Sequence, residues 1–345
     1  MHELTHSPLP ELASYPKVRL GHVPTPLEFM PRLSSRFEPL QLYVKRDDCT
    51  GLGFGGNKVR QLEYYLGDAL SKGCDTVLST GAIQSNFMRT LAAAAGKLGL
   101  ECHIQLEDRV PGKSELYHRS GNRMLSGLFG AHISFCPDGE DEVEADLRVR
   151  ALADELAASG RKPYVIPLKP VRKPKGAFGY ADAALELTGQ FQSAGIEPDM
   201  ILVGSGSGIT HSGLLLGLRL LGSGIPVLGA CVRRPADLQA PRVLGHCNNL
   251  CEMIGREGMV TEQDIRVSDR AYFPGYGQLT ESVTGAVELA ATHEGLLLDP
   301  VYSGKALATL IAMIESGELS ECRTVVFIHT GGTPALFAYQ DDMKL

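Results

Sequence analysis

One lysine, Lys58, lies where a glycine-rich turn enters a predicted helix. The segment reads Gly55-Gly56-Asn57-Lys58, and apolar residues recur with helical spacing from Gln61 onward. Glycines let the backbone approach a flat ligand because they carry no Cβ, and Asn57 is a competent N-cap. A helix N-terminus favours a lysine in its neutral form. A neutral amine is nucleophilic, so this pattern predicts a lysine that forms an imine with an aldehyde; the alternative is an ordinary surface lysine.

A second turn, between a predicted strand and a predicted helix, has the composition of a phosphate-binding loop. It consists of Gly204, Ser205, Gly206, Ser207, Gly208, Ile209 and Thr210. Amides at a helix N-terminus, together with hydroxyl groups, hold a phosphate without a metal. The turn has neither the Gly-Lys-Ser/Thr ending of a nucleoside-triphosphate loop nor GxGxxG spacing. A purely structural turn and an NADP site remain alternatives, the latter because Arg233 and Arg234 follow the next predicted strand.

Four further segments carry polar side chains that could meet the same ligand. The residues are Gln84, Ser85 and Asn86 in one loop, Thr330 in another, and Tyr276 and Tyr302 in glycine-flanked segments. The first three offer enough polar groups to grip a carboxylate or a phenolate, although two of them could simply cap a helix. Thr330 could hydrogen-bond a ring nitrogen. Each tyrosine is either a packed aromatic or an acidic hydroxyl near flexible backbone.

The elements that must position these loops alternate between strands and helices. The predicted strands are 76–79, 102–106, 164–166, 200–203, 226–232 and 324–329, and the predicted helices are 84–98, 180–192 and 210–221. Such alternation favours an α/β architecture with mostly parallel sheets. Ligands in these folds bind at the carboxyl ends of strands, so the residues after Ser79, Val203 and His329 are the ones that should form a site. The proline-rich and lysine-rich segment 163–175 is the best candidate for a hinge or a domain boundary.

The composition is that of a globular protein with a large core. The chain has 345 residues, of which 43% are hydrophobic and 21% charged, which suggests about two domains. The net charge is −7 and no basic run occurs, so we expect neither nucleic acid nor a membrane as partner. The eight cysteines are dispersed without zinc-site spacing. The first residues have no signal-peptide pattern, so we expect a cytoplasmic protein without a metal.

Taken together and in order, six segments resemble one enzyme family. They are KRDD at 45–48, GGNKVR at 55–60, GAIQSN at 81–86, GSGSGITH at 204–211, DPVYSGKA at 299–306 and HTGGTPAL at 329–336. The chain resembles the pyridoxal-phosphate (PLP) family that contains D-cysteine desulfhydrase and 1-aminocyclopropane-1-carboxylate (ACC) deaminase, a group with the tryptophan-synthase-β-like fold. The likeness runs from about residue 24 to residue 336, which is nearly the whole chain.

The resemblance implies an α/β fold of two open, twisted, mostly parallel sheet domains with the PLP site in the cleft between them. Residues 1–59 and 171–345 would form the larger, PLP-binding domain, and residues 60–170 a smaller inserted α/β domain. Members of the family commonly form homodimers, so a homodimer is expected.

The resemblance also implies a role for each candidate residue. Lys58 would bond the cofactor's aldehyde, Asn86 would contact its phenolic oxygen, residues 204–210 would hold its phosphate, and Thr330 would lie by its ring nitrogen. Ser85 would meet the substrate carboxylate or help in proton transfer, with Gln84, Asn86 and Phe87 beside the substrate. Tyr276 and Tyr302 would face the reacting carbon and the leaving group.

Two positions separate subgroups of the family, and three others depart from its pattern. Ser303 and Thr330 stand where ring-opening deaminases carry glutamate and leucine, which resembles the desulfhydrase branch. Phe87 replaces a usual histidine, Ile209 a usual glycine, and Gln278-Leu279 a usual proline-containing sequence. Since Phe87 removes a polar contact beside the expected carboxylate site, the substrate need not be D-cysteine.

The resulting expectation is a PLP-dependent lyase that performs β-elimination on a small amino acid with a leaving group on Cβ. D-cysteine, giving pyruvate, sulfide and ammonia, is the first candidate. Alternatives within the class are an L-cysteate sulfo-lyase, a serine-type dehydratase or racemase, and an ACC deaminase. From other classes, an NADP-dependent oxidoreductase and a non-catalytic protein that keeps the fold stay open.

Overall fold

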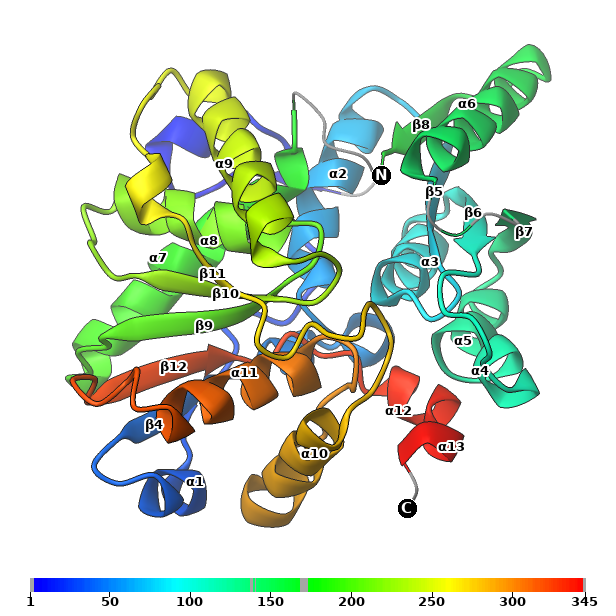
Figure 1. Ribbon diagram of the computed structural model, residues 1–345. Coiled ribbons are helices and arrows are strands. Elements are labelled where there is room, and N and C mark those ends of the chain that lie inside the picture. Colours follow the sequence, from blue (N-terminus) through cyan, green and yellow to red (C-terminus); the bar gives the residue numbers. More distant parts are fainter. Residues whose placement is uncertain (1–2, 137–138, 140, 168–172, 344–345) are drawn as a thin grey trace.

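Two separate sheets organise the molecule, with a short two-stranded sheet near the N-terminus (Figure 1). The computed structural model describes residues 3–136, 139, 141–167 and 173–343. The short sheet pairs β1 (Leu4–Thr5) with β2 (Lys17–Val18). Within the described residues, no helix combines the length and the apolar character that a membrane span requires.

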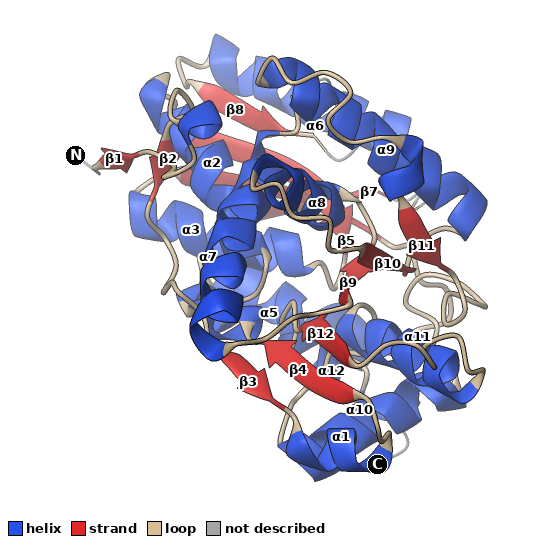
Figure 2. Ribbon diagram, turned by 90° about the vertical axis from the view of Figure 1, so that its left-hand side faces the viewer, coloured by secondary structure: helices blue, strands red, loops and turns tan. Residues whose placement is uncertain are grey.

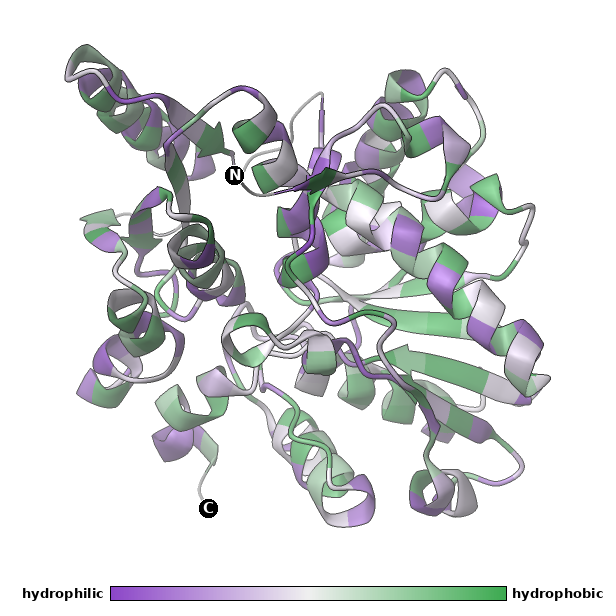
Figure 3. Cartoon of the chain, turned by 180° about the vertical axis from the view of Figure 1, so that it is seen from behind, coloured by the Kyte–Doolittle hydropathy of each residue, from purple (hydrophilic) through white to green (hydrophobic). Residues whose placement is uncertain are grey.

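The larger sheet has six strands in the order β11-β10-β9-β12-β4-β3, all parallel except β3. The strands are β3 (Leu27–Phe29), β4 (Gln41–Lys45), β9 (Met200–Ser205), β10 (Val227–Cys231), β11 (Arg266–Ser268) and β12 (Thr324–Ile328). Helices cover both faces, so its central strands are apolar throughout, as the hydropathy colouring of Figure 3 shows.

Alternate residues of the central strands face two different cores. Ile201 and Val203 pack with α7 (Phe178–Ala194), α8 (Ile209–Leu220) and α9 (Ala236–Met253). Leu202 and Phe327 pack on the other face with α1 (Pro31–Arg36), α10 (Glu281–Glu294) and α11 (Ser303–Glu315). This alternation follows from the two-residue period of a strand.

The smaller sheet has four parallel strands in the order β7-β6-β5-β8. They are β5 (Thr76–Ala82), β6 (Glu101–Glu107), β7 (His132–Cys136) and β8 (Pro163–Ile166), accompanied by α3 (Asn86–Leu98), α4 (Glu115–Arg119), α5 (Gly121–Leu128) and α6 (Glu142–Ala158). Helix α2 (Lys58–Ser71) packs against both α3 and α7, so it lies between the two sheets (Figure 2). The short helices α12 (Pro334–Ala338) and α13 (Gln340–Met343) end the described chain.

The predicted α/β class with parallel sheets is confirmed, and every predicted strand is present. The helix predicted over 84–98 begins two residues later, at Asn86, because Ser85 is its N-cap. The prediction that Asn57 caps α2 is wrong. Asn57 already has helical backbone angles, φ −54° and ψ −23°, and makes no capping hydrogen bond.

The division into domains stays a proposal. We propose that 60–170 is the smaller domain, because all four strands of the smaller sheet fall within 76–166 and the larger sheet takes strands from both sides of that segment. The expected hinge falls partly on residues 168–172, and the boundary at 170–171 with it; these positions lie outside the described residues.

Candidate active site

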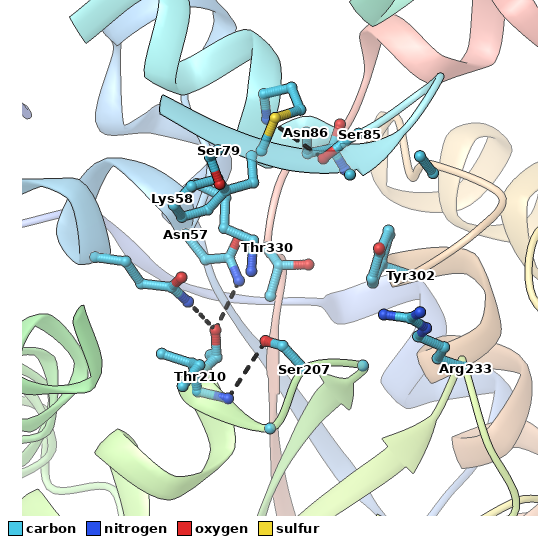
Figure 4. A pocket seen from close by; sticks show the side chains of 18 of the residues that line it. Asn57, Lys58, Ser79, Ser85, Asn86, Ser207, Thr210, Arg233, Tyr302 and Thr330 are labelled. Atoms are coloured by element: carbon cyan, nitrogen blue, oxygen red, sulfur yellow. Dashed lines mark hydrogen bonds between the residues drawn. The ribbon is translucent and has the colours of Figure 1, made fainter. Parts of the chain in front are cut away.

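A pocket between the two sheets brings together loops from four strand ends. Its lining includes residues 79–82 at the end of β5 and 85–88 after it, Gly204 near the end of β9 and 206–211 after it, Arg233 after β10 and Thr330 after β12. Lys58, Tyr276 and Tyr302 also line it, and Figure 4 shows the labelled side chains around one common space. Residues that follow Ser79, Val203 and His329 therefore line one pocket.

Lys58, the first residue of α2, is held against the last loop of the chain. The Asn57 amide donates to the Thr330 carbonyl at 3.0 Å. A Cβ at Gly56, which has φ +112°, would lie 2.9 Å from the same carbonyl oxygen, so only glycine allows this approach. Burial lowers the pKa of Lys58 to about 8. A substantial fraction of this amine is therefore neutral near physiological pH, as an imine-forming lysine requires.

The turn before α8 has the geometry of an anion site. Gly208 precedes the helix with φ +90°, and the Thr210 hydroxyl oxygen accepts hydrogen bonds from Asn57 Nδ2 and Gln61 Nε2, both at 2.8 Å. These two donors occupy both acceptor sites of the hydroxyl, so its proton points elsewhere. The Ile209 amide at the helix start donates to Ser207 Oγ at 3.5 Å (Figure 4). The Thr210 proton and the amides of this helix start can serve a phosphate.

The polar residues Ser85 and Asn86, which follow β5, line the pocket, and their side chains also bond to neighbouring parts of the chain. Ser85 caps α3 by accepting from the Met88 amide at 3.3 Å, and it lines the pocket. Asn86 Oδ1 accepts from Asn122 Nδ2 at 2.8 Å, which fixes the side-chain amide and leaves its own NH₂ free to donate. Phe87 lines the pocket and packs edge-on against Tyr65, with ring centroids 6.4 Å apart.

Two of the expected site residues do not line the pocket. Gln84 donates to the Tyr117 and Ser120 carbonyls at 2.5 and 3.0 Å, so its amide braces the loop between α4 and α5. Ser205 Oγ accepts from Gln239 Nε2 at 2.8 Å, on the far side of its strand. Neither side chain is placed to contact a ligand, because each is already used to hold a neighbouring element.

Tyr276 and Tyr302 meet inside the pocket, with their hydroxyl oxygens 3.0 Å apart. Burial raises the pKa of both hydroxyls, and the hydrogen bond between them lowers the pKa of Tyr276 while raising that of Tyr302. Both hydroxyls are therefore protonated at neutral pH, and either can donate a proton to a departing group.

Two buried charged residues hold the tyrosines, and sequence reasoning assigned neither a role. Asp299 accepts from the Tyr302 amide at 2.9 Å. Lys305 donates to the carbonyls of Tyr272 and Gly275 at 2.7 and 2.6 Å, and so fixes the backbone just before Tyr276. Both belong to the DPVYSGKA segment, whose charged residues on either side of Tyr302 were the available signal.

Two arginines also line the pocket, and they come from different sheets. Arg109 follows β6 and pairs with the fully buried Glu107 through Nε and Nη2, at 3.0 and 2.7 Å. Arg233 follows β10 and forms an ion pair with Glu142 at 2.5 Å. The sequence pointed to Arg233 only as part of a dinucleotide site and gave no signal for Arg109.

One group of possible metal ligands occurs in the described chain, away from the pocket. Glu101, His103 and His132 place a ligand atom each within 4.8 Å of one another, and none of the three lines the pocket. The sequence gave no sign of this group because the two histidines are brought together only by the pairing of β6 with β7.

Comparisons with known proteins agree with this geometry. Residues 18–331 match the family described as pyridoxal-phosphate dependent enzyme. The D-cysteine desulfhydrases of Salmonella paratyphi A and Salmonella newport are each 40% identical over 332 residues, covering 96% of this chain and 98% of the relative. The crystal structure of an ACC deaminase homologue has a TM-score of 0.86 and 37% identity, covering 96% of each chain. The fold is also similar to that of a fungal L-serine ammonia-lyase from Rhizomucor miehei. That structure is 19% identical and has a TM-score of 0.68, covering 94% of this chain and 98% of its own.

The residues present suit the cofactor of that family. A lysine with a lowered pKa can bond an aldehyde, and the Thr210 hydroxyl with the α8 amides can hold a phosphate. The NADP alternative is wrong, because the family that residues 18–331 match depends on pyridoxal phosphate. The chain therefore belongs to the family of pyridoxal-phosphate-dependent enzymes and is a lyase that uses pyridoxal 5'-phosphate as its cofactor.

Proposed function

We propose that this enzyme eliminates a leaving group from Cβ of a small amino acid, with D-cysteine as the first candidate. The overall reaction would give pyruvate, sulfide and ammonia. The observation that carries the proposal is the paired tyrosine hydroxyls, 3.0 Å apart, in the same pocket as Lys58. The 40% identity to D-cysteine desulfhydrases over nearly the whole chain supports the choice of substrate.

Lys58 is proposed to move the proton at the substrate Cα. The bound cofactor withdraws electrons from that carbon and makes its proton acidic. A lysine whose pKa is near 8 is well matched to take up and return a proton at neutral pH, whereas an ordinary lysine stays charged. Burial of the amine is therefore the physical cause of its usefulness as a base.

Other pocket residues are proposed to orient the reactants. Asn86 would donate to the cofactor's phenolic oxygen, since Asn122 already satisfies its carbonyl oxygen. Thr330, 7% exposed, would face the ring nitrogen with a neutral hydroxyl. A neutral partner there limits how much negative charge the ring accepts, which suits a short-lived carbanion and therefore elimination. Ser85 and Phe87 would contact the substrate carboxylate end.

Tyr276 and Tyr302 are proposed to protonate the departing sulfur. Their hydroxyl groups share one hydrogen bond, so loss of a proton from one is stabilised by the other. The ACC deaminase alternative is less well supported at this position. Ser303 donates its hydroxyl to Asp299 at 2.7 Å and offers no carboxylate to the pocket.

The test is a substrate panel with one matched pair of variants. Purified enzyme should absorb violet light and should release pyruvate from one enantiomer of cysteine. Lys58→Ala should lose the absorbance and at least about 10²–10⁴-fold in turnover, the range of a lost acid–base group. Lys72→Ala, on the exposed end of the same helix, should retain both. Activity in Lys58→Ala equal to the parent, or an absorbance carried by another lysine, would refute the assignment.

We also propose a homodimer in the cytoplasm. All eight cysteines are free, which is the usual state in a reducing compartment, and the family resemblance supports the dimer. Light scattering coupled to size-exclusion chromatography should give about twice the chain mass of 37.1 kDa; a monomer mass would contradict the dimer.

A further inference from the structure

The pocket wall beside the tyrosines carries two guanidinium groups. Arg109 and Arg233 both line the pocket, and the electrostatic contacts of each include Tyr276 and Tyr302. Figure 4 places the Arg233 side chain next to Tyr302. The two arginines therefore lie where the proposed reaction releases its leaving group.

Arg109 is a buried, oriented cation with bonding capacity left over. Arg109 is 8% exposed, and its Nε and Nη2 both donate hydrogen bonds to the Glu107 carboxylate. Glu107 is itself held by the Thr80 hydroxyl at 2.6 Å. Within the described part of the chain, Arg109 Nη1 makes no hydrogen bond. Since a guanidinium presents its donors in a fixed fork, the remaining donors face a defined direction.

Arg233 pairs with a carboxylate, that of Glu142, which also contacts two other arginines. Glu142 contacts Arg233 at 2.5 Å, Arg234 at 3.3 Å and Arg242 at 3.4 Å. Burial, and then the charge of Arg109, lower the pKa of Arg233, so the two pocket arginines repel one another. Among the described residues, the carboxylates Glu107 and Glu142 pair with three arginines, Arg109, Arg233 and Arg234, besides Arg242. A buried excess of positive charge is costly unless an anion joins it.

The cofactor does not account for this excess. Its phosphate has a site in the turn before α8, where the Thr210 hydroxyl and the helix amides lie. The arginine of the cluster that touches that turn is Arg234, through the Gly206 carbonyl at 2.8 Å. The proposed carboxylate end of the substrate lies by Ser85, on the loop after β5. The remaining position for an anion is the group on Cβ.

We propose that Arg109 and Arg233 form a subsite for an oxyanion on the substrate's Cβ, and that the preferred substrates carry a sulfonate there. The inference rests on the proposed β-elimination. Two arginines from opposite sheets can each donate to sulfonate oxygens, as guanidinium groups do for carboxylates and phosphates. The Cβ–S bond breaks with its electron pair on sulfur, so the products are sulfite, pyruvate and ammonia after uptake of one water. No oxidant or reductant is needed.

Binding of unreactive analogues tests the subsite without turnover. 3-Sulfopropanoate has both acidic groups but no amine, and butanoate lacks the sulfonate. Calorimetry on the holoenzyme should show the sulfonate binding about 10- to 100-fold more tightly, the range of one or two hydrogen bonds to a charged group. Arg233→Gln should remove most of that preference and leave butanoate unchanged. Arg148→Gln, an equal charge change at an exposed position of α6, should alter neither affinity.

Arg109 requires a gentler change, because its removal would strand the buried Glu107. Arg109→Lys keeps a charge for Glu107 and loses the fork, and should also lower the sulfonate preference. Equal loss of butanoate and 3-sulfopropanoate in Arg233→Gln would assign this arginine to the α-carboxylate and overturn the proposal. Equal affinity of the parent enzyme for the two analogues would overturn it as well.

Kinetics then separates this proposal from the proposed function. The parent should release pyruvate from one enantiomer of cysteate with a higher kcat/KM than from cysteine or β-chloroalanine, and Arg233→Gln should reverse that order. Pyruvate from cysteine but not from cysteate would overturn the subsite and keep the elimination. No pyruvate from any compound would overturn the elimination, while the analogue binding would still decide the subsite.

Discussion

Two clusters of buried charge differ in balance: one is bonded to the turn before Lys58, and the other lies at the pocket wall. The first, which we call the floor network, joins two cations and two anions: Lys45, Arg60, Asp47 and Glu186. Arg60 donates to Asp47 at 2.9 and 3.1 Å and to Glu186 at 2.9 and 3.0 Å. At the pocket wall, the arginine cluster of Arg109, Arg233 and Arg234 pairs with only two carboxylates of the described chain, Glu107 and Glu142.

The difference shows which cluster serves the fold and which serves a ligand. In the floor network, the Arg60 charge and hydrogen bonds outweigh the effect of burial and lower the pKa of Asp47. The Asp47 carbonyl also accepts from the Gly56 amide at 3.1 Å, so the network fixes the turn that carries Lys58. A balanced network needs no further partner. The arginine cluster gains stability only when an anion completes it.

The largest expected effect comes from breaking the floor network. Arg60→Met leaves Asp47 and Glu186 buried with Lys45 as their remaining cation, so we expect a loss of about 3–5 kcal/mol in unfolding free energy. Urea unfolding measures it. Arg119→Met removes the exposed pair with Glu115 and should cost less than about 1 kcal/mol. Comparable losses in the two variants would mean that the floor network contributes no more than a surface pair.

The pH dependence of the rate at which the apoenzyme binds its cofactor tests the lowered pKa of Lys58, whose turn the floor network holds. The neutral amine attacks the aldehyde, and its fraction rises about tenfold per pH unit below the pKa. We expect the apoenzyme to bind cofactor faster from pH 6 to about 8 and then at a constant rate, because the pKa is about 8 instead of 10.5. Between pH about 8 and 10.5, Lys58 holds a proton in the unfolded chain but not in the folded chain. The unfolding free energy of the apoenzyme should therefore rise with pH between about 8 and 10.5.

Stopped-flow absorbance at a series of pH values follows the binding of the cofactor by the apoenzyme, with Nα-acetyllysine, whose ε-amine is free, as the reference amine. A rate that keeps rising to pH 10 would mean that Lys58 titrates as an exposed lysine does.

Phe87 tests the substrate side of the pocket opposite the arginines. Phe87→His restores a donor beside the expected carboxylate site, and one hydrogen bond to a charged group is worth roughly 1.5–3 kcal/mol, about ten- to a hundredfold in kcat/KM. We expect this gain for D-cysteine in a pyruvate-release assay. Phe87→Leu, which keeps an apolar side chain against Tyr65, controls for packing. If the parent already uses D-cysteine well and the histidine variant gains nothing, Phe87 is a packing residue.

The smallest effect is expected from the arginine cluster itself. Arg233→Gln leaves Glu142 in contact with Arg234 and Arg242 and removes the repulsion with Arg109. We expect its unfolding free energy to change by less than about 1 kcal/mol, although its sulfonate affinity falls. A loss as large as that of Arg60→Met would show that Arg233 supports the fold, and the contrast between the two clusters would disappear.

Much of the fold follows from local pattern. The predicted strands are short apolar runs, and several of them, such as 200–203, are buried on both faces. Two short strands escaped prediction: β4, whose apolar run of three residues has polar residues at both ends, and β7, which is mostly exposed. Lys58 and Thr210 could be proposed for the site because each follows a glycine-rich turn, Lys58 as the first residue of α2 and Thr210 in the first turn of α8.

The direction of individual side chains did not follow from sequence. Gln84 and Ser205 stand in the right loops, yet their side chains bond to Tyr117 and Gln239. Arg109 lies far from Arg233 in the chain, and only the packing of one sheet against the other brings both to the pocket. Such contacts depend on tertiary structure, which has no local signature in a single sequence.

The central position of β12 constrains the order in which the protein can form during synthesis. This strand lies between β9 and β4, although it is the last of the chain. The larger sheet therefore has a gap at its centre until residue 328 has left the ribosome, whereas the smaller sheet is complete in sequence by residue 166. Because Thr330 also anchors the turn before Lys58, we expect a chain shortened by about 20 residues to lose its central strand and its catalytic lysine geometry together. Prematurely terminated chains would then be inactive and easily cleared.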